Sequence, residues 1–81
     1  MKYLRMPRFK SEFKKFSPEV RLAFQKQISY LLQDIRHPSL RAKKYDEGLD
    51  IWQARVTKNV RFYFRSQGGV YILLNIRRHK D

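Results

Sequence analysis

Apolar and polar positions alternate most regularly in the last third of the chain, from Asp50 to Asp81. Three runs there have a period of two, which is the period of side chains along a β-strand. In the first run the apolar positions are Trp52, Ala54 and Val56, and the polar ones are Gln53, Arg55 and Thr57. In the second, Val60, Phe62 and Phe64 alternate with Arg61, Tyr63 and Arg65. In the third, Val70, Ile72, Leu74 and Ile76 alternate with Tyr71, Leu73, Asn75 and Arg77. The pattern predicts three strands with one apolar face and one arginine-bearing face.

Turn residues separate these runs. Lys58-Asn59 predicts a tight hairpin turn, in which the asparagine is able to adopt a positive φ. Gln67-Gly68-Gly69 predicts a second hairpin turn. We therefore expect the three strands to pair antiparallel, one after the other.

A period near 3.6 residues precedes the strands. Phe9, Phe13 and Phe16 are spaced to line one side of a short helix. Ser17-Pro18-Glu19 predicts the start of a second helix, with serine as N-cap, proline in the first turn and an acid near the positive end of the dipole. Its apolar positions are Val20, Phe24, Ile28, Leu31 and Ile35. We expect it to end at His37-Pro38, because the residue before a proline disfavours the helical conformation.

The remaining segments complete the predicted order βααβββ. Tyr3 to Met6 indicates a short first strand, and the polar, basic segment from Ser39 to Gly48 is expected to contact the core through Leu40 and Tyr45. The chain should form a single α+β domain over residues 1–81, in which a helical hairpin packs on a small, mainly antiparallel twisted sheet. The helices are expected to cover Trp52, Phe62, Phe64, Ile72 and Leu74.

Charge adds a functional indication. Nineteen Lys and Arg residues against seven Asp and Glu residues give a net charge of +12, which favours a nucleic acid or an acidic protein as partner. Composition alone leaves an unspecific basic role open. Cysteine is absent, which excludes disulfides and thiolate metal sites. Without a signal-like or membrane-spanning apolar run, we expect a soluble, cytoplasmic protein with no membrane partner.

Several motifs together resemble the RelE/ParE superfamily of bacterial toxins. They are His37-Pro38, the basic run Arg41 to Lys44, the strands Trp52 to Val56 and Val60 to Phe64, and the closing Arg78-His79-Lys80-Asp81. The resemblance implies a small toxin that is paired with an antitoxin. RelE-like members cut messenger RNA in the ribosomal A site, whereas ParE-like members poison DNA gyrase.

The resemblance also implies roles for single residues. Arg55 and Arg61 match the basic residues that RelE-like enzymes direct at the scissile phosphate, and His79 matches a histidine or arginine near the C-terminus. Gln53 stands where some members have a second lysine. The sequence departs from the family at its end, because many relatives continue beyond this point to a catalytic tyrosine, whereas this sequence ends at Asp81.

Elementary chemistry is consistent with these roles. Cleavage of RNA without a metal requires the 2′-hydroxyl to lose a proton and attack phosphorus, and the leaving 5′-oxygen to gain a proton. Arg55 and Arg61, on one face of adjacent strands, would stabilise the phosphoryl charge. His79 would donate the proton, since imidazole ionises near neutral pH. Tyr63 would stack on a base or shield the arginine stems. The other candidate RNA-binding residues are Gln53, Arg65, Arg77, Arg78, Lys43 and Lys44.

Three functions stay open at this point. The first is a toxin endoribonuclease that cleaves messenger RNA on the ribosome and blocks translation. The second is a ParE-like gyrase inhibitor without nuclease activity, and the third is a decayed toxin that binds RNA but no longer cuts. The expected partners are an acidic antitoxin, messenger RNA and the ribosome, with DNA contacted only through an antitoxin complex. No metal or cofactor is expected, because the acids are scattered and the two histidines lie far apart.

Overall fold

The computed structural model describes residues 2–79, which form five strands, two α-helices and one 3-10 helix. The elements are β1 (Lys2–Arg5), α1 (Pro7–Phe13), α2 (Pro18–Gln33), η1 (Pro38–Leu40), β2 (Lys43–Asp46), β3 (Ile51–Thr57), β4 (Val60–Gln67) and β5 (Val70–Arg78). The sheet order is β1-β5-β4-β3-β2, with β1 parallel to β5 and every other pair antiparallel. The predicted α+β fold is confirmed, and β2 is a short strand that the predicted order βααβββ does not contain.

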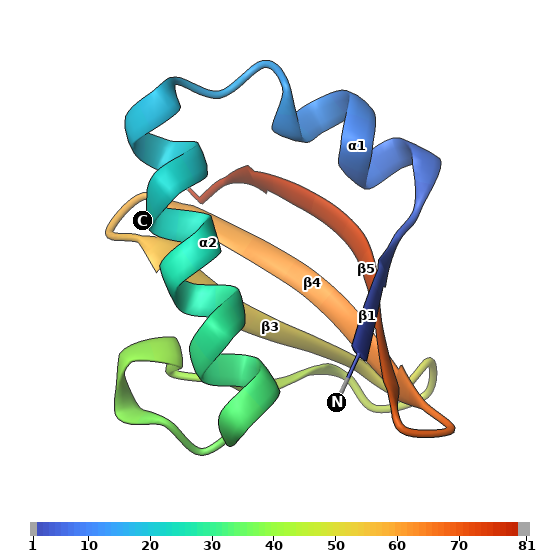
Figure 1. Cartoon of the computed structure of the whole chain (residues 1–81). Coiled ribbons are helices and arrows are strands. Elements are labelled where there is room, and N and C mark those ends of the chain that lie inside the picture. The colour runs from blue at the N-terminus through green and yellow to red at the C-terminus, as the bar shows by residue number, and fades with distance from the viewer. Residues whose placement is uncertain (1, 80–81) are drawn as a thin grey trace.

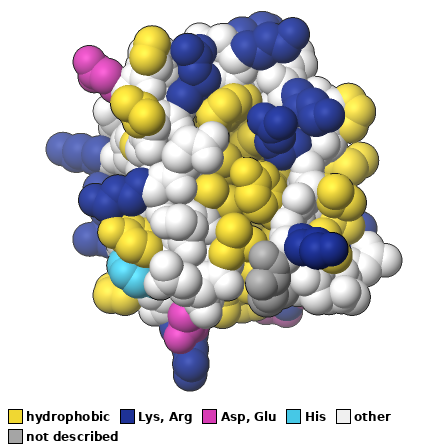
Figure 2. Space-filling view, in the orientation of Figure 1, with side chains coloured by type: hydrophobic (Ala, Val, Ile, Leu, Met, Phe, Trp, Pro, Cys, Tyr) yellow, Lys and Arg dark blue, Asp and Glu magenta, His cyan; other side chains and the backbone are white. Residues whose placement is uncertain are grey.

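Both α-helices lie on the same face of the sheet (Figure 1). Phe24 of α2 joins the helices to the sheet, because its ring contacts Phe9 and Phe13 of α1 and Phe62 of β4 with ring centroids 5.2–5.3 Å apart. The helical layer does not close completely. Figure 2 shows apolar side chains at the surface between α2 and β1, with Lys and Arg side chains around them.

Helix α2 begins as predicted. The Ser17 hydroxyl accepts a hydrogen bond from the backbone N–H of Val20 at 3.3 Å, and Pro18 occupies the first turn. The helix ends at Gln33, however, and not at His37-Pro38. The carboxylate of Asp34 accepts the backbone N–H of Arg36 at 2.8 Å, and this local bond competes with continued helix. Hydrogen bonding to Arg36 also lowers the pKa of Asp34 below its ordinary value.

The last strand differs from the predicted pattern because it contains a β-bulge. Tyr63 pairs with Asn75 and the next residue, Phe64, pairs with Leu73, so Leu74 is left over between them. The bulge reverses the alternation. The predicted apolar face Val70, Ile72, Leu74 and Ile76 is therefore wrong except at Ile76, and the residues of β5 in the core are Tyr71, Leu73 and Ile76.

The two hairpin turns lie where they were predicted but differ in backbone. Gly68 and Gly69 both have positive φ, 58° and 79°, as a type I′ turn requires. At the other turn, Asn59 does not have the positive φ that asparagine can adopt. Its N–H bonds to Thr57 Oγ1 at 3.3 Å, and a second bulge shifts the register between Arg55 and Thr57.

Candidate functional site

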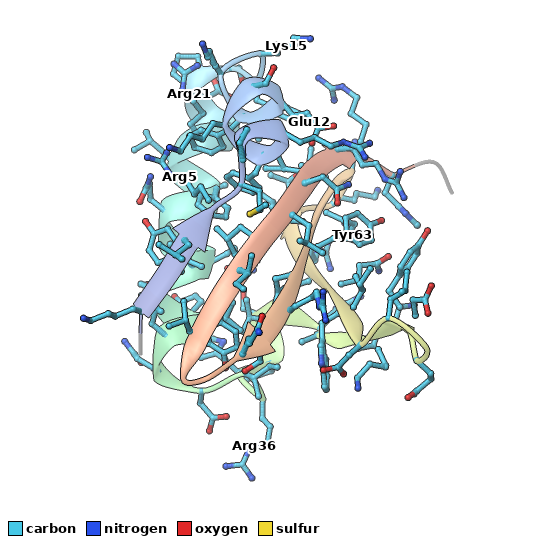
Figure 3. All side chains as sticks on the ribbon, turned by 90° about the vertical axis from the view of Figure 1, so that its right-hand side faces the viewer. Arg5, Glu12, Lys15, Arg21, Arg36 and Tyr63 are labelled. Atoms are coloured by element: carbon cyan, nitrogen blue, oxygen red, sulfur yellow. The ribbon has the colours of Figure 1, made fainter. Side chains whose placement is uncertain are left out.

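The face of the sheet opposite the helices, here called the outer face, carries most of the predicted functional residues. Figure 3 shows the helices on one side of the sheet and Tyr63 on the other. The register places Gln53 of β3 opposite Tyr63 of β4, and Tyr63 opposite Asn75 of β5. Directly paired residues point to the same side of a sheet, so all three lie on the outer face.

Two buried polar residues form the floor of a cavity on this face. Tyr63 is 4% exposed and Gln53 is 6% exposed, and the Tyr63 hydroxyl donates to Gln53 Oε1 at 3.2 Å. The cavity has a volume of about 390 Å³ and is here called the tyrosine–arginine pocket. It is lined by Tyr45, Gln53, Tyr63, Arg77, Arg78 and His79.

A bridge between side chains of β2 and β5 explains why the floor is buried without a helix above it. The Arg77 guanidinium lies over the Tyr63 ring at 4.8 Å, and its Nη2 donates to the Tyr45 hydroxyl at 3.3 Å. Tyr45 in turn packs edge-on against Tyr63 with ring centroids 4.8 Å apart. Arg77 comes from β5 and Tyr45 from β2, so the bridge spans both intervening strands.

The pocket changes the pKa of Arg77. Its interaction with Tyr63, followed by that with Tyr45, raises the pKa of Arg77 above its ordinary value. Like any arginine, Arg77 is charged at every physiological pH. A fixed charge held by two phenols is suited to binding an anion, because its position changes little when the anion arrives.

Tyr45 was missed as a site residue and was wrongly predicted to contact the core. Tyr45 is 53% exposed and lies on the edge strand β2. The residue before it, Lys44, pairs with Trp52 on the helical side. In a strand the next side chain points to the opposite face, so Tyr45 reaches the outer face. The parity of these two residues would have revealed this, but only once β2 is recognised as a strand.

A row of three arginines crosses the outer face beside the pocket. Arg55 of β3 pairs with Arg61 of β4, and Arg61 pairs with Arg77 of β5. Adjacent strands lie about 4.8 Å apart, which sets the spacing of the row. The register thus confirms that Arg55 and Arg61 share a face.

Arg61 also stabilises the turn between β3 and β4. Its Nη1 donates to the carbonyl oxygens of Thr57, Lys58 and Val60 at 2.7, 3.1 and 3.2 Å. All three bonds use the same nitrogen. Since a guanidinium carries five N–H donors on three nitrogens, Nε and Nη2 are left to contact a ligand.

His79 follows β5 and lies half-buried at the wall of the pocket. Its backbone N–H donates to the carbonyl oxygen of Asn59 at 2.7 Å, which ties the end of β5 to the turn between β3 and β4. Beside it, the Arg78 guanidinium lies 5.6 Å from the ring of Phe16. The pocket thus brings together an imidazole, the Arg77 guanidinium and two phenols, while the Arg78 guanidinium lies on the helical side near Phe16.

Three predicted RNA-binding residues lie outside the pocket lining. Lys44 pairs with Trp52 on the helical side, where its ammonium lies 5.0 Å from the indole and bonds to Asp50, which raises the pKa of Lys44. Lys43 is exposed opposite Gln53 at the edge of the outer face. Arg65 is exposed opposite Ile72, toward the Gly68-Gly69 turn.

Within residues 2–79, no group of three or more His, Cys, Asp or Glu side chains is arranged to hold a metal ion. Within the same range, no helix is long and apolar enough to cross a membrane.

The fold of this chain, with helices on one face of a five-stranded sheet, is similar to that of toxins of known structure. The YoeB/ParE toxin from Agrobacterium tumefaciens is similar over 99% of this chain and 100% of that chain, with a TM-score of 0.81 and 15% identity. A chain of the E. coli RelBE toxin-antitoxin complex is similar over 99% of this chain and 98% of that chain, with a TM-score of 0.76 and 14% identity. A chain of the RelBE2 complex from Mycobacterium tuberculosis is similar over 98% of this chain and 96% of that chain, with a TM-score of 0.74 and 15% identity.

The sequence itself matches no protein-family model and no curated protein. The likeness therefore rests on three-dimensional structure, and it establishes the fold of the chain.

Proposed function

We propose that this chain is the toxin of a toxin–antitoxin pair and that it is an endoribonuclease acting on messenger RNA. The observation that carries the proposal is the tyrosine–arginine pocket, where His79 and Arg77 meet on an open, cationic face. The fold supports it, because similar chains occur in structures described as RelBE and YoeB-YefM toxin–antitoxin complexes.

The proposed reaction needs only the groups of the chain and of the RNA. The 2′-hydroxyl loses its proton to water and its oxygen bonds to the adjacent phosphorus. The bond from phosphorus to the 5′-oxygen breaks, and His79 protonates that oxygen. The products are a 2′,3′-cyclic phosphate and a 5′-hydroxyl. Arg61 and Arg77 stabilise the charge that accumulates on the phosphoryl oxygens, while Arg55 extends the cationic surface along β3.

The proposed partners follow from charge. A chain with a net charge of +12 is attracted to ribosomal and messenger RNA, and an acidic antitoxin would neutralise it by covering the outer face. In this proposal DNA is contacted only through the antitoxin complex.

The test is primer extension on messenger RNA from cells that express the chain or one of its variants. We expect discrete cuts that weaken about 10²- to 10⁴-fold in His79→Gln and about 10²- to 10³-fold in Arg61→Ala, because these variants remove a proton donor and a charge-stabilising donor. Arg65→Ala is the matched control, because it removes an arginine from the outer face but not from the pocket. Cuts of equal strength in all three variants would contradict the assignment.

The gyrase alternative has one observation in its favour, since the similar Agrobacterium protein is described as a YoeB/ParE toxin. A supercoiling assay with purified gyrase separates the two functions. Intact transcripts in arrested cells, together with loss of supercoiling, would replace the nuclease with a gyrase inhibitor. Ribosome binding without either effect would indicate a toxin that no longer cuts.

A further inference from the structure

A second cavity, distinct from the tyrosine–arginine pocket, lies between α2, η1 and β3. It has a volume of about 490 Å³ and is here called the basic cleft. Its lining residues are Ala23, Lys26, Gln27, Pro38, Ser39, Arg41, Arg55 and Val56. Three of these are cationic and none is acidic, which is the composition of an anion-binding site.

A buried glutamine holds the walls of the cleft in place. The last pair between β2 and β3 is Lys43 with Gln53, so β3 continues beyond the end of its neighbour. Gln27 of α2, 5% exposed, contacts this free edge: its Nε2 donates to the carbonyl oxygens of Arg55 at 2.8 Å and Ser39 at 3.0 Å. Its Oε1 accepts from the Ser39 hydroxyl at 2.9 Å. The three elements are therefore fixed before any ligand binds, which lowers the entropic cost of binding.

The charges around the cleft are not neutralised by acidic side chains. Across residues 2–79 the ion pairs join Arg8 to Glu12, Arg36 to Asp34 and Lys44 to Asp50, and none includes a cation of the cleft. Lys26, Arg41 and Arg55 thus contribute like charges to the surroundings of one cavity. An anion in the cleft would be attracted by all three.

The arginine row connects the basic cleft to the tyrosine–arginine pocket. Arg55 lines the cleft, pairs with Arg61 and, through Arg61, adjoins Arg77 of the pocket. Two strand spacings separate the ends of the row, a distance of about 10 Å. A single strand of RNA lying along the row would place one phosphate near the pocket and another near the cleft.

We propose that the basic cleft binds a backbone phosphate of the same RNA strand that the tyrosine–arginine pocket cleaves. The inference rests on the proposed function and adds a second contact that fixes the path of the strand. Guanidinium and ammonium groups supply the charge-assisted hydrogen bonds that a phosphate needs. The arginine row favours RNA over an acidic peptide, because the phosphates of an RNA strand form a continuous row of negative charges that matches it.

The test compares two double variants that remove the same charge. Lys26→Gln with Arg41→Gln changes the cleft, while Lys2→Gln with Arg5→Gln changes exposed cations of β1 at the opposite edge of the sheet. The probe is fluorescent single-stranded RNA of about twelve nucleotides, comparable to the site sizes of single-strand binding domains. Its riboses carry 2′-O-methyl groups, so that it cannot be cleaved. Anisotropy reports affinity, and thermal melting shows that both variants fold.

We expect the cleft variant to bind this RNA roughly tenfold more weakly than the β1 variant, a difference of about 1.4 kcal/mol. The slope of log K against log salt should also decrease by about 0.7 for each phosphate that the variant no longer binds. Equal binding of the probe by both variants would overturn the proposal. The proposal would also be overturned if the cleft variant bound a glutamate-rich peptide more weakly than the β1 variant did but bound the RNA equally well.

Cleavage of unmodified RNA, measured in parallel, separates this inference from the function on which it rests. If the unaltered chain does not cut but its RNA binding depends on the cleft, the nuclease proposal fails and the phosphate site stands. If it cuts and both double variants bind and cut alike, the nuclease stands and the phosphate site fails.

Discussion

Tyr45 and Arg77 belong to strands that are not neighbours, yet their side chains meet above the outer face. The contact is possible because both side chains are long and the two residues between them, Gln53 and Tyr63, form a low floor. Each partner restrains the other. The Tyr45 hydroxyl and the Tyr63 ring hold the Arg77 guanidinium in one place, so that its charge is already oriented when a phosphate arrives.

This arrangement predicts a specific role for the Tyr45 hydroxyl. We expect Tyr45→Phe to reduce RNA cleavage about tenfold, the value of one net hydrogen bond of about 1.4 kcal/mol. The melting temperature should change little, because Tyr45 is 53% exposed. The measurement is single-turnover cleavage together with thermal melting.

Tyr3→Phe is the matched control, since it deletes a phenol hydroxyl on β1 outside the pocket. Equal activity of both variants would mean that the Arg77 side chain keeps its place without Tyr45. Because the hydroxyl acts on Arg77 and not on overall charge, the salt dependence of RNA binding should be the same in both variants.

The candidate site was predictable only in part from single residues. Arg55, Arg61, Arg77 and His79 stand at positions where an alternating pattern places them on one face, and the register bears this out for the three arginines. The sequence does not show that Arg61 binds its own turn or that Lys44 pairs with Asp50. Those contacts depend on which acceptors the fold brings near each cation.

At the scale of elements, a helix or strand could be predicted from the sequence where its residues favour a single structure. The N-terminus of α2 was predictable because Ser17, Pro18 and Glu19 favour the same start for separate reasons. In β5 both parities are apolar, so alternation could not decide which side faces the core or reveal the bulge at Leu74. Strand β2 was missed because Lys43 to Asp46 has no apolar alternation.

The junction between α1 and β5 yields a prediction about stability. Glu12 Oε1 accepts the backbone N–H of Ile76 at 3.1 Å, at a point on β5 beyond the end of β1 (Figure 3). Glu12→Ala removes this acceptor from a partly buried N–H, and we expect the free energy of unfolding to decrease by about 1–3 kcal/mol. Urea denaturation measures the change.

Glu12→Gln is the control for this prediction. It keeps an oxygen acceptor at the same place but loses the ion pair with Arg8, which is exposed and contributes little. We therefore expect it to retain most of the stability. If Gln destabilises as much as Ala, the charge of Glu12 matters more than its hydrogen bond to β5.

At the scale of the whole molecule, the net charge of +12 opposes the compact state. Added salt screens repulsion between exposed cations, with a Debye length of about 10 Å at 0.1 M. We therefore expect the melting temperature to rise as sodium chloride is added at low ionic strength. Differential scanning calorimetry measures it, and a melting temperature that falls with salt would show that ion pairs outweigh repulsion.

An uncharged solute at matched osmolality is the control for that experiment. It should leave the melting temperature nearly unchanged over the range in which salt raises it. Because an acidic partner neutralises the same charges, the direction of the salt effect also indicates whether neutralisation by such a partner would stabilise the fold.

The parallel pairing of β1 with β5 affects the order in which the protein can be completed during synthesis. Residues 2–5 are made before their strand partners, residues 70–73, which follow much later in the sequence. Bringing such distant segments together is slow and cannot start until both exist. Arg77 and Arg78 also come from β5. A chain in which β5 has not yet been made therefore lacks both the tyrosine–arginine pocket and one end of the arginine row.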